Sequence, residues 1–173
     1  ERRPAEMDQL EYGSLIHYLL QQIFQAYCAE EIAAMSKETL IQAIQEYIAV
    51  YVNMKLGGSE DKTQRFQFVF RCIADSAHVV IHHIAKELSQ SKFQPIGHEL
   101  SLKENGGDFS PLTISLEDGT VVQVEGKIDR TDVMEQDGVQ YVRVVDYKTG
   151  KKEFKIGDIL HGINMQMLIY LAA

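Results

Sequence analysis

The dipeptide Asp137-Gly138 places the strongest constraint on how this chain can fold. Both residues tolerate a positive φ, which the two central residues of a two-residue hairpin turn require. Apolar, valine-rich segments lie before and after the dipeptide. If Gln136 and Val139 close the hairpin, Asp129 lies directly opposite Asp146 on one face of the sheet, with their Cβ atoms about 5 Å apart.

This predicted pairing gathers the side chains needed for metal-assisted hydrolysis of a phosphodiester. Two facing carboxylates repel each other unless a cation or a proton lies between them. Lys148, two residues beyond Asp146, projects from the same strand face. Its ammonium can orient a water molecule or stabilise negative charge in a transition state. A more common role for an Asp-x-Lys sequence is a solvated strand edge or a salt bridge, but the apolar neighbours of both acids predict buried strands, and buried acids need partners.

Five short segments, taken in chain order, carry a resemblance to a known group of nucleases. They read Gly-Ser-Leu-Ile-His at 13–17, Phe-Gln-Pro-Ile-Gly-His-Glu at 93–99, Gly-Lys-Ile-Asp-Arg at 126–130, Asp-Tyr-Lys-Thr-Gly at 146–150 and Gln-Met-Leu-Ile-Tyr at 166–170. Together they resemble the RecB-like branch of the PD-(D/E)XK nuclease superfamily, and most closely the nuclease domain of AddB-type subunits of ATP-dependent helicase–nucleases. The order of the motifs is more specific than any one of them.

The resemblance implies a metal site and a catalytic lysine. It implies that His17, Asp129 and Asp146 bind a divalent cation, that the backbone carbonyl of Tyr147 is a further ligand, and that Lys148 is catalytic together with the two aspartates. Oxygen-rich ligation suits Mg²⁺, and one imidazole makes Mn²⁺ at least as suitable.

Three further residues have two interpretations each. The resemblance implies that Gln166 and Tyr170 belong to the catalytic set and face the substrate, and their four-residue spacing puts both on one helical face. The alternative is an ordinary amphipathic helix. Glu99 is either a secondary active-site acid or an exposed glutamate on a strand.

The function implied by the resemblance is metal-dependent hydrolysis of DNA phosphodiester bonds by an exonuclease-type domain. That domain would belong to a cytoplasmic helicase–nuclease acting in double-strand-break repair and recombination. Its implied partners are DNA, delivered as a single strand by a helicase, and a partner subunit of the helicase–nuclease. Two alternatives stay open: a catalytically inactive module of this fold that guides DNA strands or scaffolds a complex, and a stand-alone RecB-like nuclease.

The spacing of apolar residues predicts an α+β fold in a single domain, with a helical part at 1–92 and a nuclease sheet with its motif helix at 93–173. We expect an N-terminal helical layer on an antiparallel four-stranded sheet, followed by a C-terminal helix. The predicted helices run from about Leu10 to Ala33, from Ser36 to Gly57-Gly58, from Ser59 or Asp61 through Leu88, and from about Ile159 onward. The resemblance implies a restriction-endonuclease-like core whose final strand is missing, so both ends are expected to be cut from a longer polypeptide.

Composition bears on partners and cofactors. The net charge of −8 argues against tight DNA binding by the fragment alone, because DNA-binding modules usually carry a basic footprint. The chain has no apolar run of about 18 residues and no signal-peptide pattern, which predicts a soluble, unsecreted protein. Cys28 and Cys72 lack metal-ligand spacing and are expected to be small buried residues. The resemblance implies an iron–sulfur cluster in the full-length parent, and these two cysteines are not expected to assemble it in this fragment. His78 and His82 are expected to be structural or surface residues.

Overall fold

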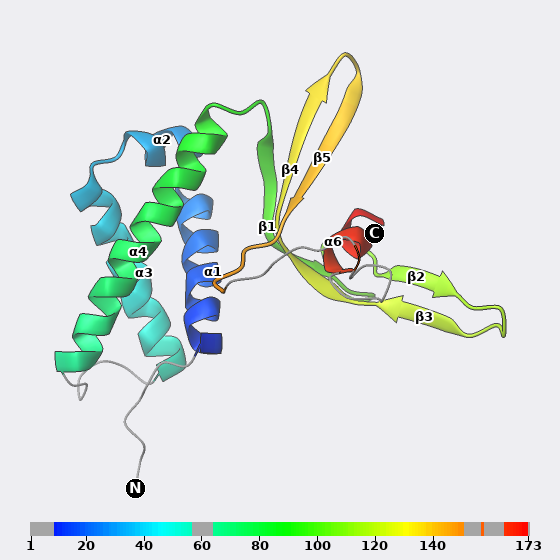
Figure 1. The fold of residues 1–173 in the computed structure, drawn as a ribbon, viewed down its shortest axis with the longest axis horizontal. Helices are drawn as coiled ribbons and strands as arrows, with labels where there is room; N and C mark the ends of the chain where they lie inside the picture. The colour runs from blue at the N-terminus through cyan, green and yellow to red at the C-terminus, as the bar shows by residue number, and fades with distance from the viewer. Residues whose placement is uncertain (1–8, 57–63, 151–156, 158–164, 173) are drawn as a thin grey trace, which may run out of the picture. The chain divides into compact units, whose positions relative to one another are not determined.

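The computed structural model describes residues 9–56, 64–150, 157 and 165–172. The chain divides into two compact units, Glu1–Lys92 and Phe93–Ala173. The first contains helices α1 (Gln9–Ala26), α2 (Ala29–Ala34), α3 (Lys37–Leu56) and α4 (Gln64–Ser89). The second contains strands β1 (Gln94–Leu102), β2 (Leu112–Ser115), β3 (Val121–Val124), β4 (Gly126–Gln136) and β5 (Val139–Val145), followed by helix α6 (Gln166–Ala172) (Figure 1).

The helical unit is held together by one apolar core. Helix α4 packs against α2 and α3, and α1 packs against α3. The fully buried side chains recur three or four residues apart along each helix, which is the spacing of one helical face: they include Leu15, Leu19, Ile23, Ile32, Leu40, Ile44, Ile81 and Leu88. None of the helices in the described residues is both long enough and apolar enough to cross a bilayer.

The start of the second long helix matches its prediction, but the first predicted helix is wrong in extent. The hydroxyl of Ser36 accepts the N–H of Thr39 at 3.2 Å, as an N-cap does, and α3 begins at Lys37. The helix predicted to reach Ala33 instead breaks before Cys28, whose backbone is extended (ψ 164°). The carboxylate of Glu31 accepts the Cys28 N–H at 2.9 Å and so starts α2 as a separate helix.

The predicted β4–β5 hairpin is confirmed. Asp137 and Gly138 both have positive φ, 55° and 74°. Gln136 pairs with Val139, and the antiparallel register continues without a shift to the pair Arg130–Val145. The turn therefore sets the alignment of the two strands that lead to the acidic residues.

The single four-stranded sheet is not what forms. Among the described residues, β1, β4 and β5 make a three-stranded sheet in the order β1–β4–β5, and β2 and β3 make a separate two-stranded ribbon. Strand β1 pairs with β4, although β2 and β3 lie between these two strands in the sequence. After β1 the chain folds back on the end of that strand, where the carboxylate of Asp108 accepts the Ser101 N–H at 2.7 Å.

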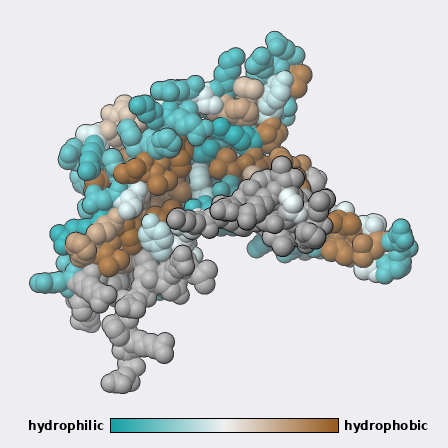
Figure 2. Space-filling model, viewed as in Figure 1, coloured by the Kyte–Doolittle hydropathy of each residue, from teal (hydrophilic) through white to brown (hydrophobic). Residues whose placement is uncertain are grey.

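The β2–β3 ribbon exposes apolar residues. Ile114, Leu116, Val121 and Val122 are all solvent-exposed, and Figure 2 shows brown residues along the ribbon with a hydrophilic tip.

The last helix lies against the sheet of its own unit, as predicted. The hydroxyl of Tyr170 on α6 donates to the backbone carbonyl of Lys127 on β4 at 2.7 Å. The predicted start of this helix near Ile159 lies outside the described residues. The predicted packing of the helical layer on the sheet would be a contact between the two units, and it stays a prediction.

Candidate active site

Asp129 occupies a buried position near the start of β4. Its side chain is 8% exposed, and its carboxylate accepts the backbone N–H of Tyr147 at 2.5 Å. Asp146 follows directly after the last residue of β5. The antiparallel register ends at the pair Arg130–Val145, one residue short of Asp129 and Asp146, so their direct pairing stays a prediction.

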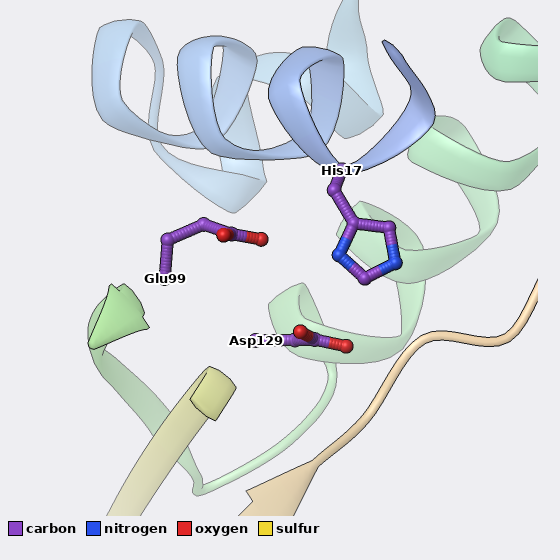
Figure 3. A group of neighbouring side chains, drawn as sticks. All are labelled: His17, Glu99 and Asp129. Carbon is purple, nitrogen blue, oxygen red and sulfur yellow. The ribbon is translucent and has the colours of Figure 1, made fainter. Parts of the chain in front are cut away.

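Glu99 lies beside Asp129 on the other neighbouring strand. On β1, the residues flanking Glu99 pair with the residues flanking Asp129, His98 with Arg130 and Leu100 with Ile128. One carboxylate oxygen of Glu99 and one of Asp129 lie within 4.8 Å of each other (Figure 3). Two such oxygens suit a hard divalent cation.

The surroundings of Glu99 exclude the interpretation that it is an exposed glutamate. Its side chain is 11% exposed, and the ammonium of Lys127 lies 2.5 Å from one of its oxygens. Figure 3 also labels His17, which belongs to α1 in the helical unit. Ligation by His17 would require the helical unit to supply a ligand to the sheet unit, and it is a proposal.

Glu99 also has a strained backbone. Its φ is 56°, inside strand β1, and a side chain in the left-handed region costs about 1–2 kcal/mol. Such strain often persists where a side chain must be aimed at a functional site.

We expect Glu99→Gly to be more stable than Glu99→Ala by about 1 kcal/mol, because glycine adopts a positive φ without the Cβ clash. Urea unfolding of both variants measures the difference. At Glu135, an exposed residue of regular strand β4, the same pair of substitutions should give the opposite order. Equal stability of the two Glu99 variants would contradict the strain.

Asp146 lies at the centre of a second polar cluster. The ammonium of Lys148 lies 2.8 and 2.7 Å from its two oxygens, and the amide of Gln166 donates to it at 3.0 Å. The same amide nitrogen lies 3.0 Å from the Tyr170 hydroxyl. The structure thus brings together all four of these predicted residues, from the end of β5 and from α6.

Tyr170 reaches this cluster across a glycine. A Cβ added at Gly126 would lie 3.1 Å from the ring of Tyr170, closer than most such contacts. The glycine of the 126–130 motif therefore provides the close approach between α6 and β4.

A family comparison decides what this arrangement belongs to. The model of the PD-(D/E)XK nuclease superfamily matches residues 1–173. The chain belongs to this superfamily. The Asp146-Tyr147-Lys148 segment matches the (D/E)XK part of the superfamily's name, and Gln166 of α6 donates to the same acid.

Curated relatives of this chain are named as subunits of larger enzymes. It is 29% identical over 175 aligned residues to the B subunit of the ATP-dependent helicase/deoxyribonuclease of Clostridium acetobutylicum, and 30% identical over 175 to that of Caldanaerobacter subterraneus. Both alignments cover 100% of this chain. The corresponding protein of Clostridium botulinum is 34% identical over 113 residues, 65% of this chain and 10% of the relative. The chain spans 15% of the length of the first two relatives.

The sequence patterns missed a buried ion network on the opposite face of β4. Asp132 is fully buried and Arg130 is 2% exposed. Arg130 contacts Asp132 through Nε at 2.8 Å and Nη2 at 3.0 Å, and Arg143 of β5 contacts the same carboxylate at 2.7 and 2.8 Å. The sequence feature that could have predicted this network is Arg130-x-Asp132 on a strand expected to be buried, because buried charges must pair.

Tyr147 joins this network to the acidic face. Its hydroxyl accepts a hydrogen bond from Arg130 Nη1 at 2.8 Å. Burial, the largest effect, raises the pKa of Tyr147 to about 12. The phenol is therefore neutral at physiological pH.

His78, His82 and both cysteines belong to the helical unit. The rings of His78 and His82 stack with centroids 5.9 Å apart. His161 lies outside the described residues. The prediction of buried cysteines is wrong: Cys28 and Cys72 are both exposed, because Cys28 begins a short helix and Cys72 lies on the outer face of α4.

Proposed function

We propose that this chain is a divalent-metal-dependent deoxyribonuclease domain that hydrolyses DNA phosphodiester bonds. The observation that carries the proposal is the contact of Lys148 with Asp146, at 2.7–2.8 Å, next to Tyr147, whose backbone N–H donates to Asp129. An ammonium held on one acid next to a second acid suits hydrolysis of a phosphate ester better than a solvated strand edge does.

The donor set fits a hard divalent cation. We propose that Asp129 and Asp146 provide oxygen ligands, with the carbonyl of Tyr147, and that His17 adds one nitrogen. Glu99 joins this set, since one of its carboxylate oxygens lies within 4.8 Å of one of Asp129. Three carboxylates with one imidazole suit Mg²⁺ or Mn²⁺. When bound, such an ion neutralises charge on the phosphate and lowers the pKa of a ligated water.

The chain's own residues supply position and charge. The N–H of Tyr147 holds one oxygen of Asp129, which orients that carboxylate. Lys148 donates protons only, so its role is to orient the attacking water or to stabilise the negative charge that develops on the phosphate. Gln166, held between Asp146 and Tyr170, is placed to contact the DNA backbone beside the acids.

The relatives favour a place in a larger machine. Their names describe the B subunit of an ATP-dependent helicase/deoxyribonuclease. We propose that this chain acts in such a cytoplasmic helicase–nuclease, in double-strand-break repair and recombination, on a single strand delivered by a helicase and beside a partner subunit. An inactive strand-guiding module and a stand-alone nuclease are the competing functions, and the presence of both aspartates and Lys148 favours activity.

Removal of the metal tests the proposal. The full-length polypeptide should degrade linear DNA with Mg²⁺ or Mn²⁺ present, with ATP added for the helicase, and should stop when EDTA is in excess. Excess Mn²⁺ should restore cleavage. Asp129→Asn, which keeps the shape but removes the charge, should not be restored at the same concentration. Cleavage that persists unchanged in EDTA would contradict metal dependence.

A further inference from the structure

The segment that carries Asp146 and Lys148 has no strand pairing of its own. Strand β5 ends at Val145, and residues 146–148 are outside regular secondary structure. The position of these two side chains therefore depends on whatever anchors the segment between them. Tyr147 lies at its centre.

Tyr147 is anchored at two points, one on each side of the sheet. Its backbone N–H donates to Asp129 at 2.5 Å. Its hydroxyl accepts from Arg130 at 2.8 Å, and the Arg130 guanidinium carbon lies 5.7 Å from the centre of its ring. Successive residues of a strand point to opposite faces, so Asp129 and Arg130 hold the same tyrosine from the two faces of β4.

Arg130 in turn is held rigidly. Asp132 lies two residues along β4 on the same face, and its carboxylate contacts two nitrogens of the Arg130 guanidinium. Arg143 of β5 binds the same carboxylate. The guanidinium of Arg143 also lies 4.8 Å from the centre of the Phe93 ring. A planar guanidinium held at two points loses little further entropy when it binds a third group.

We propose that Asp132, Arg143, Arg130 and Tyr147 form a positioning relay that orients Asp129 and the 146–148 segment for metal binding. The proposal rests on the proposed function, because it concerns the site where the cation binds. None of the four side chains needs to touch the cation or DNA: the relay acts through the backbone of Tyr147. Groups that orient metal ligands in this way typically change metal affinity or activity by about 10–100-fold when removed.

Tyr147→Phe is the decisive variant, because it removes one hydroxyl and leaves the ring and the N–H. We expect calorimetric titration of the full-length protein to give a Kd for Mn²⁺ about 10-fold higher or more. The Mn²⁺ concentration for half-maximal DNA cleavage should rise equally, with KM for DNA unchanged. Tyr141→Phe is the matched control, since Tyr141 is an exposed tyrosine on β5, and it should change neither quantity.

A second variant separates positioning from general stability. Arg130→Lys keeps the charge but loses the two-point contact, and it should raise the Kd for Mn²⁺ similarly. Combined with Tyr147→Phe it should add little, since both changes break one link. Additive effects in the double variant, or a Tyr147→Phe Kd equal to that of Tyr141→Phe, would overturn the relay.

These outcomes differ from those that would refute the proposed function. If the wild-type protein binds Mn²⁺ but does not cleave DNA, the nuclease assignment fails, and the Mn²⁺ titrations still decide the relay. If the wild-type protein binds no Mn²⁺, both proposals fail. If the wild-type protein cleaves DNA and Tyr147→Phe matches it in Kd and rate, only the relay fails.

Discussion

Lys148→Ala is expected to lower the rate of DNA cleavage by about 10²–10³-fold or more, the usual loss when one electrostatic stabiliser of a transition state is removed. Metal affinity should stay close to that of the wild type, because an ammonium donates hydrogen bonds and never ligates a cation. Loss of the contact with Asp146, 2.7–2.8 Å in length, leaves that carboxylate available to the ion. Cleavage of linear DNA by the full-length protein, measured beside calorimetric titration with Mn²⁺, tests both parts.

Two companion variants make the result specific. Asp146→Ala removes a proposed ligand and should lose both metal binding and cleavage. Lys103→Ala removes a lysine that is exposed and lies outside the site, and it should change neither. If Lys148→Ala and Asp146→Ala both cut DNA at the wild-type rate, this nuclease-superfamily domain is a passive guide for DNA strands.

Asp132→Ala is expected to reduce the free energy of unfolding by about 3–5 kcal/mol, because it leaves a buried arginine without its counter-charge. Arg130 is 2% exposed and Asp132 is fully buried, so water cannot replace the missing carboxylate. A loss of that size is a large share of the roughly 5–15 kcal/mol that stabilises a typical domain. Urea or thermal unfolding measures it.

The control for this prediction lies on the same strand. Glu135 on β4 is an exposed carboxylate, and Glu135→Ala should change stability by less than about 0.5 kcal/mol. Replacing Arg130, Asp132 and Arg143 together by apolar residues of similar volume should cost much less than Asp132→Ala, since no buried charge is then left unpaired. A loss below about 1 kcal/mol for Asp132→Ala would show that the arginines find other partners.

Features encoded by neighbouring residues were predictable from the sequence. Asp137-Gly138 sets the hairpin register because the turn type depends on those two residues alone, and β4 and β5 pair as that turn requires. Ser36 marks the start of α3 through a hydrogen bond to a residue three positions away. The proximity of Gln166 to Tyr170 follows from helical geometry. The family resemblance, carried by the order of the motifs, added the expectation that these pieces serve one site.

Only the tertiary structure decided features that depend on residues far apart in the chain. Strand β1 pairs with β4 and not with β2 or β3, which follow it in the sequence. This pairing is set by burial in the whole unit and not by any local turn signal. That pairing sets Glu99 beside Asp129 and gives it a positive φ that its own residue type disfavours. The Arg130–Asp132–Arg143 network likewise exists only once β4 and β5 are paired and covered, because burial is what forces these charges together. Local patterns therefore determined the elements and their turns, whereas long-range pairing and burial determined which acids and arginines meet.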